Sequence, residues 1–250
     1  MLLTEVTNEL QTMFDNAQSV AILTGAGISA ESGVPTFRGG GDTAIWSWRG
    51  RPVSELSSAE MMASDPKLVW EWFDYRRGML KDLQPNPGHH ALAMWERRFA
   101  DFTLITQNID DLHRAAGSLN VLELHGNICR ARCLRCRSTF EVRESPLEQN
   151  PPLCFVCGNA ARPDVVLFGE MLPEGVFDRA EEAAARSDLF FVIGTSAVVY
   201  PAASLPIVAK QSGAKVIEVN PEQTDISFMA DVTILGKAGE ILSQFLKERG

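Results

Sequence analysis

Short apolar runs recur along the chain, and each is followed by sequence in which apolar residues return at helical spacing. Strands that alternate with helices in this way are typical of a parallel sheet with helices on both faces. The pattern therefore predicts an α/β fold with a Rossmann-like, doubly wound parallel sheet. The six expected strands are residues 19–24, 102–106, 121–124, 189–193, 215–219 and 232–235.

Two stretches interrupt this alternation. Residues 39–87 contain glycines, several tryptophans and helical patterning but no convincing strand, whereas residues 126–162 are turn-rich and hold all the cysteines. Because both stretches lie inside the α/β series, we expect them to fold together as a small domain. The main domain then consists of residues 1–38, 88–125 and 163–250. The two domains are expected to border a cleft, where ligands commonly bind.

The N-terminal segment predicts an amphipathic helix rather than an export signal. Residues 3–14 place apolar side chains at helical spacing, and the acidic Glu5 and Glu9 do not suit the basic start of a signal peptide. The uncharged stretch 189–209 is long enough to imitate a membrane span, but its glycine and prolines favour a strand, a loop and a helix start. We therefore expect no membrane contact and a cytoplasmic location.

The charge balance limits the expected partners. The chain has 23 Lys and Arg against 32 Asp and Glu, a net charge of -9. This charge repels nucleic acids and anionic membranes at long range and attracts cationic peptides. The local basic cluster lies among the cysteines, and we interpret it as a solvated rim rather than a nucleic-acid surface. It consists of Arg130, Arg132, Arg135, Arg137 and Arg143.

A glycine-rich turn follows the first expected strand. The pattern Gly25-x-Gly27-x-x-Ala30 permits a tight turn and a close approach of the backbone to a pyrophosphate at a helix N-terminus. A turn that serves packing alone is the alternative. A dehydrogenase would carry an acidic residue at a strand end about 20 residues on. Here Asp42 lies in a glycine-rich loop and Asn220 is the best strand-end candidate, so a dinucleotide fits but hydride transfer is not supported.

The cysteine spacing predicts a metal site. Two Cys-x-x-Cys pairs have 17 residues (137–153) between them, a spacing typical of a four-thiolate zinc ribbon. Four thiolates complete a tetrahedron without an open position for water, so we expect one structural Zn²⁺ rather than disulfides. Cys129 is expected to be an incidental thiol, with a ligand swap as the alternative. The four expected ligands are Cys133, Cys136, Cys154 and Cys157.

Polar residues follow two neighbouring strands at the points where the strands end. Gln107, Asn108 and Asp110 come after the second expected strand, and His125 follows the third. The carboxyl ends of strands in an open α/β sheet are where ligands collect. A lone histidine is more often structural than catalytic, but His125 also stands at the junction with the cysteine-rich stretch, which favours it over the other histidines as a catalytic candidate. The other histidines are expected to do no chemistry: His89, His90 and His113.

Taken in order, these motifs resemble the sirtuin family over residues 19–240. The resemblance implies an NAD-dependent protein-lysine deacylase that consumes NAD and releases nicotinamide and O-acyl-ADP-ribose. Its partners are then acylated lysine side chains of proteins or peptides. The similar segments are the cofactor loop at residues 25–38, Gln107-Asn-Ile-Asp110, His125-Gly126, the four paired cysteines, Phe168-Gly-Glu170, Gly194-Thr-Ser196 and Val219-Asn220.

The resemblance also implies roles for individual residues. His125 acts as the catalytic base toward a ribose hydroxyl, a task that suits an imidazole because its pKa lies near working pH. Asn108 orders the nicotinamide ribose and is the second catalytic residue. The residues implied to bind NAD are Gly25, Ala26, Gly27, Ala30, Pro35, Thr36, Phe37, Arg38, Gln107, Asn108, Ile109, Asp110, His125, Gly194, Thr195, Ser196, Asn220, Pro221 and Ala238. The residues implied to bind the acylated substrate are Phe73 and Arg76 at the acyl group, and Val166, Phe168, Gly169, Glu170 and Val198 where the peptide adds as a strand.

Residues 73–76 bear on the choice of acyl group. The class III subgroup of bacterial and mitochondrial type, which removes succinyl, malonyl and glutaryl groups, carries Tyr-x-x-Arg, and here Phe73 replaces the tyrosine while Arg76 is present. Tyr75 cannot substitute, because positions 73 and 76 share a helix face and 75 does not. We therefore expect acetyl-lysine first, with succinyl- or malonyl-lysine as further candidates. A solvated charge is the alternative for Arg76.

Two other functions stay open on the sequence. An NAD hydrolase or mono-ADP-ribosyltransferase could use the same pocket, and it would release nicotinamide without an acylated peptide. A zinc-ribbon module that senses NAD or touches nucleic acid belongs to another class, and the acidic charge balance and His125 argue against it.

Overall fold

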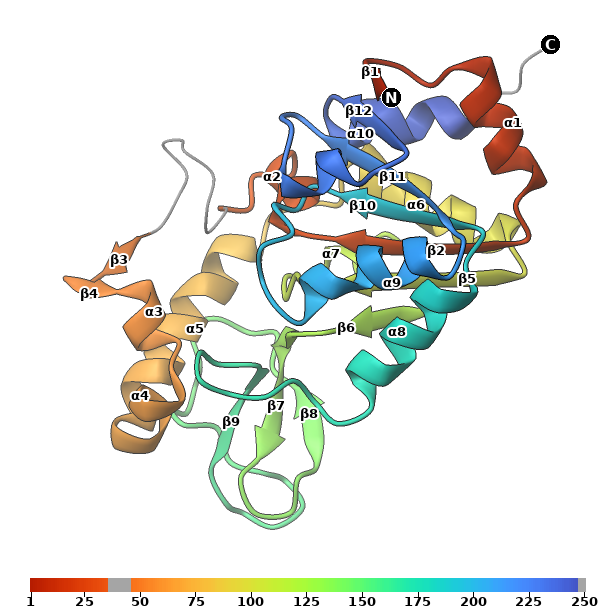
Figure 1. Ribbon diagram of the computed structural model, residues 1–250. Helices are drawn as coiled ribbons and strands as arrows, with labels where there is room; N and C mark the ends of the chain where they lie inside the picture. Colours follow the sequence, from red (N-terminus) through yellow and green to blue (C-terminus); the bar gives the residue numbers. More distant parts are fainter. Residues whose placement is uncertain (36–45, 247–250) are drawn as a thin grey trace.

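The computed structural model describes residues 1–35 and 46–246 (Figure 1). A sheet of seven parallel strands forms its centre, in the order β1-β12-β11-β10-β2-β5-β6. The strands are β1 (Leu2–Leu3), β2 (Ser19–Thr24), β5 (Asp101–Thr106), β6 (Val121–Glu123), β10 (Leu189–Ile193), β11 (Lys215–Asn220) and β12 (Val232–Leu235).

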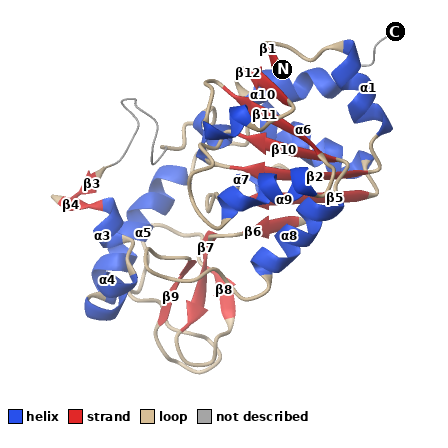
Figure 2. Ribbon diagram, in the orientation of Figure 1, coloured by secondary structure: helices blue, strands red, loops and turns tan. Residues whose placement is uncertain are grey.

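Helices cover both faces of this sheet (Figure 2). In β2, Val20 and Ile22 pack with the core of one face while Ala21 and Leu23 pack with the core of the other. Since successive side chains of a strand point to opposite faces, a strand covered on both sides must be apolar throughout. The first face carries α1 (Asn8–Asn16), α6 (Pro87–Arg98) and α10 (Ala238–Leu242), and the second carries α8 (Val176–Arg186) and α9 (Leu205–Gln211).

The strand order reverses between β2 and β10. From β2 the chain proceeds to β5 and β6 on one side, whereas β10, β11 and β12 continue on the other side. In open α/β sheets the crevice outside the carboxyl ends of two such strands is the usual ligand site. The glycine-rich turn after β2 and Gly194 after β10 both lie at this point.

A smaller antiparallel sheet and a group of helices form the second part of the molecule. Trp70 is fully buried, and its indole N–H donates a hydrogen bond of 2.8 Å to Ala161 O, so helices and sheet share a core. The sheet has the order β8-β7-β9, with β7 (Gly126–Cys133), β8 (Thr139–Glu141) and β9 (Ala161–Val165). The helices are α3 (Val53–Leu56), α4 (Ala59–Ser64) and α5 (Pro66–Leu80).

The remaining elements are short. Short helices follow β2 and β5, and three turns of 3-10 helix lie in the last fifth of the chain. These short helices and strands are α2 (Ala26–Ala30), β3 (Ser47–Trp48), β4 (Arg51–Pro52), α7 (Leu112–Ala115), η1 (Ala202–Ser204), η2 (Asp225–Phe228) and η3 (Ser243–Leu246).

The predicted fold class is confirmed, and a few local features differ from expectation. All six expected strands form, but β1 pairs with β12 and the pair β3–β4 forms inside residues 39–87, where we expected no strand. Two-residue strands are too short to show an alternating pattern. Because β9 pairs with β7, the small sheet extends past residue 162 to Val165. Among residues 1–35 and 46–246, no helix has the length and apolar character that a membrane crossing requires.

Candidate active site

The turns after β2 and β10 pack directly on each other. The N–H of Gly25 donates to Ile193 O at 3.1 Å, and the N–H of Gly27 donates to Gly194 O at 2.7 Å. A Cβ on Gly27 would lie 2.7 Å from Gly194 Cα, and one on Gly194, whose φ is +57°, would lie 2.4 Å from Ile28 N. These glycines are therefore required by the contact between the two turns, and the Gly27 N–H is already bonded within the protein.

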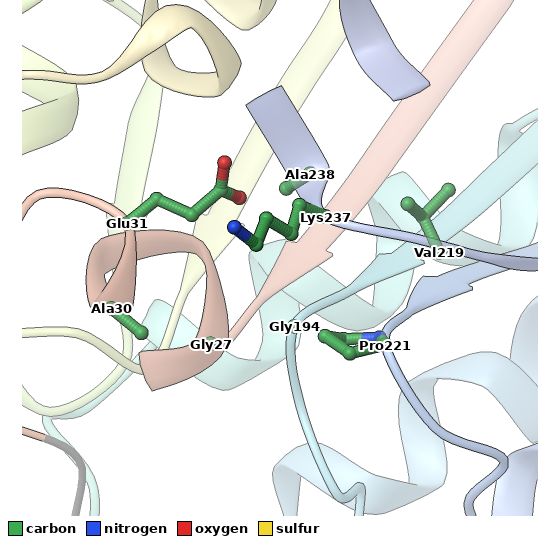
Figure 3. Close-up of a pocket in the computed structure, with 8 residues that line it drawn as sticks. All are labelled: Gly27, Ala30, Glu31, Gly194, Val219, Pro221, Lys237 and Ala238. Carbon is green, nitrogen blue, oxygen red and sulfur yellow. The ribbon is translucent and has the colours of Figure 1, made fainter. Parts of the chain in front are cut away.

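A pocket opens beside these two turns (Figure 3). Its walls come from α2, from the ends of β10 and β11 and from the start of α10. Glu31 Oε1 accepts the N–H of Gly239 at 3.1 Å, which joins α2 to α10. Five of the predicted NAD-binding residues line this pocket, while Glu31, Val219 and Lys237 were not predicted. The lining residues are Gly27, Ala30, Glu31, Gly194, Val219, Pro221, Lys237 and Ala238.

Gln107 and Asn108 connect the end of β5 to both turns. The side-chain amide of Gln107 donates to Thr195 Oγ1 at 3.0 Å. The amide of Asn108 donates to Gly25 O and to Ser29 Oγ, each at 3.0 Å. The structure thus brings together predicted residues from three segments that are far apart in the sequence.

Two buried histidines, His89 and His113, lie close to Asn108, with Ser29 between Asn108 and His89. His89 Nε2 is 3.3 Å from Ser29 Oγ, His113 Nε2 is 3.0 Å from Thr24 Oγ1, and the two rings are 4.8 Å apart between centroids. Burial lowers the pKa of His89 to about 4 and places the pKa of His113 well below its ordinary value. Both imidazoles are therefore neutral at neutral pH, and Ser29 links His89 to Asn108.

The sequence indicates the helix turn that holds His89, but not the contact that His89 makes. Helix α6 starts at Pro87 after the N-cap Asn86, and the backbone N–H of Asn86 donates to His89 Nδ1 at 3.3 Å. An Asn followed by Pro is a readable helix start. It orders His89 at the first turn, but nothing local shows that this turn faces Ser29, 60 residues away in the chain.

His125 lies just after β6, where the chain passes into the small sheet. Its Nδ1 is 2.9 Å from Gln107 O. Because a carbonyl oxygen only accepts, Nδ1 carries the proton and Nε2 is the nitrogen that can accept one. Burial lowers the pKa of His125, and the bond to Gln107 opposes part of this shift. The geometry therefore gives a neutral imidazole at neutral pH.

Asp110, which follows β5, and Arg76, which lies on α5, carry opposite charges. Asp110 is 9% exposed and its Oδ1 accepts the N–H of Leu112 at 3.0 Å. Burial raises the pKa of Asp110 despite the opposing charge of Arg76. Burial lowers the pKa of Arg76 to about 10, and Asp110 partly offsets that shift. Phe73, one turn earlier on α5, is 2% exposed and packs in the small-domain core.

The segment after β9 is bonded to both domains. The N–H of Phe168 donates to Ser57 O at 2.8 Å, and Phe168 O accepts the N–H of Ala59 at 3.0 Å. The N–H of Val166 donates to His125 O at 2.9 Å, so this segment adjoins the histidine directly. Among the predicted peptide-binding residues, those exposed are Phe168, Gly169 and Val198, whereas Val166 and Glu170 are half-buried.

Other predicted NAD-binding residues lie at the margins of the site. Ile109 packs against the small-domain core, and its carbonyl accepts the N–H of Ile128 at 2.8 Å. Asn220 is half-buried, and its amide donates to Glu222 O at 3.1 Å. Half-buried Ala26 and Pro35 and exposed Ser196 complete the described set. Thr36, Phe37 and Arg38 lie outside the described residues.

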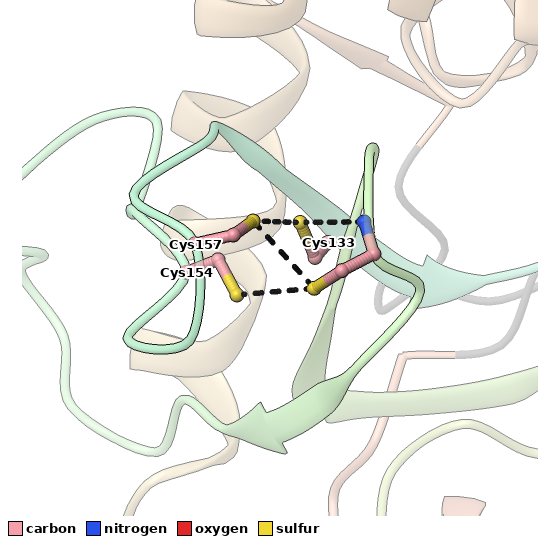
Figure 4. Close-up of side chains that lie close together, drawn as sticks. Cys133, Cys154 and Cys157 are labelled. Atoms are coloured by element: carbon pink, nitrogen blue, oxygen red, sulfur yellow. Dashed lines mark hydrogen bonds between the residues drawn. The ribbon is translucent and has the colours of Figure 1, made fainter.

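The four paired cysteines converge at the end of the small sheet (Figure 4). Their Sγ atoms all lie within 4.8 Å of one another, and Sγ of Cys133 and of Cys157 are 3.5 Å apart. Four sulfurs at about 2.3 Å from a tetrahedral Zn²⁺ would be roughly 3.8 Å apart. The N–H groups of Arg135 and Cys136 lie 3.3 and 3.4 Å from Cys133 Sγ, where they stabilise a thiolate. The cluster is therefore positioned to bind one zinc ion.

Cys129 lies on β7 outside this cluster. Its side chain is half-buried, and burial raises the pKa of the thiol to about 11. A thiol that stays protonated is a poor zinc ligand and a poor nucleophile.

The protein is similar to one family by both sequence and structure. The model of the Sir2 family matches residues 25–201. The chain is 48% identical over 233 residues to the NAD-dependent protein deacylase 2 of Pyrobaculum aerophilum, and the match covers 93% of this chain and 92% of that protein. A relative from Aquifex aeolicus, named NAD-dependent protein deacylase, is also 48% identical, with 92% of this chain and 96% of that protein covered.

Solved structures give the same result. A Sir2 homolog in complex with NAD superposes with a TM-score of 0.89 at 43% identity, covering 98% of this chain and 94% of that one. A Sir2 structure with a deacetylated p53 peptide and 3′-O-acetyl ADP ribose has a TM-score of 0.82 at 32% identity, covering 95% and 96%. With a family model over more than half of the chain and relatives near half identity over almost all of it, this protein belongs to the Sir2 family.

Proposed function

We propose that this protein is an NAD-dependent protein-lysine deacylase, which transfers the acyl group of a modified lysine to ADP-ribose and releases nicotinamide. The observation that carries the proposal is the position of His125. Its imidazole is bonded to Gln107, whose side chain donates to Thr195 in the turn after β10, while its backbone carbonyl is bonded to Val166 in the segment expected to receive a peptide. One residue would thus adjoin both substrates.

NAD is consumed here as a substrate. The turn of Gly25–Gly27, the turn of Gly194–Ser196 and Asn220 would hold the pyrophosphate and the adenosine, with Pro221 and Ala238 against the adenine. The pocket that these segments line supports this placement. When bound, NAD supplies a ribose carbon that takes the acyl oxygen as nicotinamide leaves.

The nicotinamide end would lie against Gln107, Asn108 and Asp110. The amides of Gln107 and Asn108 are held by Thr195, Gly25 and Ser29, so they are already oriented before a ligand binds. Such pre-organisation lowers the entropy lost on binding. Asp110 is buried and would accept from the carboxamide of the nicotinamide.

His125 would act as the base toward a ribose hydroxyl. The proton on Nδ1 is fixed by Gln107 O, so Nε2 takes the proton from the hydroxyl. Because burial lowers the pKa of His125, the basic form dominates at neutral pH. A site closed around bound NAD would also exclude competing water.

The acylated peptide would add as a strand beside Phe168 and Gly169, opposite Val198. Main-chain hydrogen bonds give affinity with little sequence selection. We further propose acetyl-lysine as the first substrate. Buried Phe73 offers no hydroxyl to a carboxylate, which supports acetyl over an acidic acyl group, whereas half-buried Arg76, whose charge reaches Asp110, would supply one cation near the acyl end. Succinyl- or malonyl-lysine is the second candidate.

The zinc-binding cysteines indicate a reducing compartment, since thiolate ligands are lost when they oxidise to disulfides. The cytoplasm is therefore the proposed location. A net charge of -9 supports cationic protein segments as substrates and argues against nucleic acids.

The proposal is tested by nicotinamide release from NAD with no peptide, with an unmodified lysine peptide and with its acetylated form. We expect release that depends on the acetyl group, because the acyl oxygen is the nucleophile. His125→Ala should lower deacylation by about 10²–10⁴-fold, the usual contribution of a general base. Release that is equally fast without peptide would instead identify an NAD hydrolase or an ADP-ribosyltransferase.

The acyl preference is tested on acetyl-, succinyl- and long-chain acyl-lysine peptides, with the wild type and Arg76→Ala. If Arg76 attracts an acidic acyl group, the variant loses succinyl turnover selectively, by roughly ten- to a hundredfold for one charged hydrogen bond. Equal succinyl rates in both proteins would remove this role. A matched control is Arg49→Ala, because Arg49 is an exposed arginine of the small domain paired with Glu71.

A further inference from the structure

The segment Val165–Glu170 would receive the acylated peptide, but the carboxylate of Glu170 points back into the protein. Its Oε1 is 2.5 Å from Arg162 Nη1, and its Oε2 is 2.8 Å from Arg162 Nη2. This is a fork-to-fork pair, the strongest geometry for an arginine and a carboxylate. The two side chains are only 12% and 22% exposed. A carboxylate held in this way is not available to a peptide cation.

The same carboxylate also blocks one backbone donor of the segment. Glu170 Oε2 accepts the N–H of Leu167 at 2.9 Å, and Leu167 O accepts the N–H of Glu170 at 3.0 Å. Both main-chain groups of Leu167 are therefore occupied within the turn. The bonds from Arg162 and Leu167 outweigh burial and lower the pKa of Glu170, so the carboxylate stays ionised at neutral pH.

Arg162 closes the other end of the segment. Its Nη2 donates to Val165 O at 3.0 Å, while its Nε donates to Pro163 O at 3.3 Å. The guanidinium thus spans from the end of β9 to Glu170. On its far edge the segment is fixed by the bonds of Phe168 to Ser57 and Ala59.

Gly169 differs from Leu167 in this respect. Within the described residues, neither the N–H nor the C=O of Gly169 has a hydrogen-bond partner, and Gly169 is exposed with a φ of +87°. An incoming strand can therefore pair at Gly169 but not at Leu167. Since a shift of one residue turns every side chain to the other face, the position of first pairing decides which peptide side chain points toward His125.

We propose that Arg162 and Glu170 are a positioning pair that fixes the register of the acylated peptide by closing Leu167 and leaving Gly169 open. This inference rests on the proposed deacylase function. It assigns Glu170 a role through the backbone turn rather than a direct contact with the substrate.

The pair is tested with Glu170→Gln, which removes the charge but leaves an acceptor for Leu167, and with Arg162→Lys, which keeps the charge but loses the fork. Each variant should raise the KM for an acetyl-lysine peptide by roughly ten- to a hundredfold, the value of one charged hydrogen bond. The KM for NAD should stay near its wild-type value. The peptide KM of the double variant should be no higher than that of the more strongly affected single variant, because the two residues act as one unit.

Asp101→Asn is the matched control, because Asp101 also forms a two-bond pair with an arginine, Arg186, at 2.8 and 3.1 Å. Asp101 begins β5, so this pair lies at the amino ends of the strands, away from the site at their carboxyl ends. It should leave both KM values unchanged. Thermal unfolding and zinc content are measured for each variant, and if one fails to fold, the other carries the test.

Three outcomes would overturn the pair: an unchanged peptide KM in both variants, an equal rise in the KM for peptide and for NAD, or a rise in Glu170→Gln alone. The last would mean that the carboxylate contacts the peptide directly. Wild-type turnover is measured first, so a failure of the deacylase proposal is seen as absent acyl-dependent turnover before any variant is compared.

Discussion

In β10 every residue is buried, whereas in β8 exposed residues flank a half-buried one. The main sheet has an apolar core on each face, with the aromatic cluster of Phe14, Trp95, Phe191 and Phe245 on one of them. The small sheet shares two smaller cores with α5 and ends in four converging thiols. Apolar burial can hold the first region, whereas we expect the cysteine-bearing end of the second to depend on a metal ion and on ion pairs as well.

The residues assigned to catalysis lie where these two regions meet. Asp111, next to Asp110, accepts from Arg143 of the cysteine-rich region at 2.7 Å and from Asn127 at 2.7 Å. His125 directly precedes β7 of the small sheet. The residues assigned to catalysis are therefore supported from one side by the main sheet and from the other by the cysteine-rich region, which we expect a zinc ion to stabilise. The two supports should fail under different conditions.

The largest expected effect is the loss of zinc from the small domain. Structural zinc sites contribute roughly 10–16 kcal/mol of binding free energy, so Cys154→Ser or a strong chelator should unfold residues 126–162 and lower deacylation on the order of a hundredfold or more. The main sheet should stay folded. Zinc content, limited proteolysis and deacylation rate are the measurements.

Cys129→Ser is the control for that prediction, since Cys129 lies on the same strand as Cys133 but outside the cluster. It should keep its zinc and change stability by no more than about 1 kcal/mol. A zinc-free protein with full activity would show that the small domain does not need its metal, and the contrast between the two regions would be lost.

A smaller effect is expected from acid, and it acts on the main domain. The pKa of His89 is lowered to about 4 and that of His113 well below normal, so the unfolded chain binds more protons than the folded one between pH about 6.5 and 4. The contribution of these histidines to the free energy of unfolding is therefore fully present above pH 6.5. It falls as the pH drops, by up to ~1.4 kcal/mol per pH unit for each histidine. Urea unfolding between pH 7 and 5 measures this slope.

His89→Gln should reduce the acid slope by about the share of one histidine, while His90→Gln, at the exposed neighbouring position, should leave most of it. If stability were the same at pH 7 and pH 5 in the wild type, the two buried imidazoles would have to be charged in the folded state. Zinc content should be followed in the same samples, because acid also releases thiolate-bound metal.

The sequence predicted most of the main sheet well because β2, β5, β10 and β11 are runs of five or six residues that contribute apolar side chains to both faces. The apolar runs at 189–193 and 215–219 give the position of β10 and β11 within one residue. β1 and the pair β3–β4 could not be predicted, since two residues show no period. Their pairing depends on contacts such as Leu2 with Thr233, which lie at opposite ends of the chain.

The site could be predicted where its residues belong to a short, local sequence motif. The glycine turn, the residues after β5 and His125 are adjacent to strands, and the topology places strand ends together. Partners distant in the sequence could not be predicted. Glu31 bonds to Gly239 across 208 residues, and Asn108 reaches His89 only through Ser29. No local pattern records that α2, α6 and α10 meet.

The central claim is that this one site joins cleavage of NAD to removal of an acyl group. The direct measurement is the product balance with zinc-loaded protein, NAD and an acetyl-lysine peptide, read by mass spectrometry. The account predicts equal amounts of nicotinamide, deacetylated peptide and O-acetyl-ADP-ribose at every time point. Nicotinamide and plain ADP-ribose forming while the peptide keeps its acetyl group would contradict it.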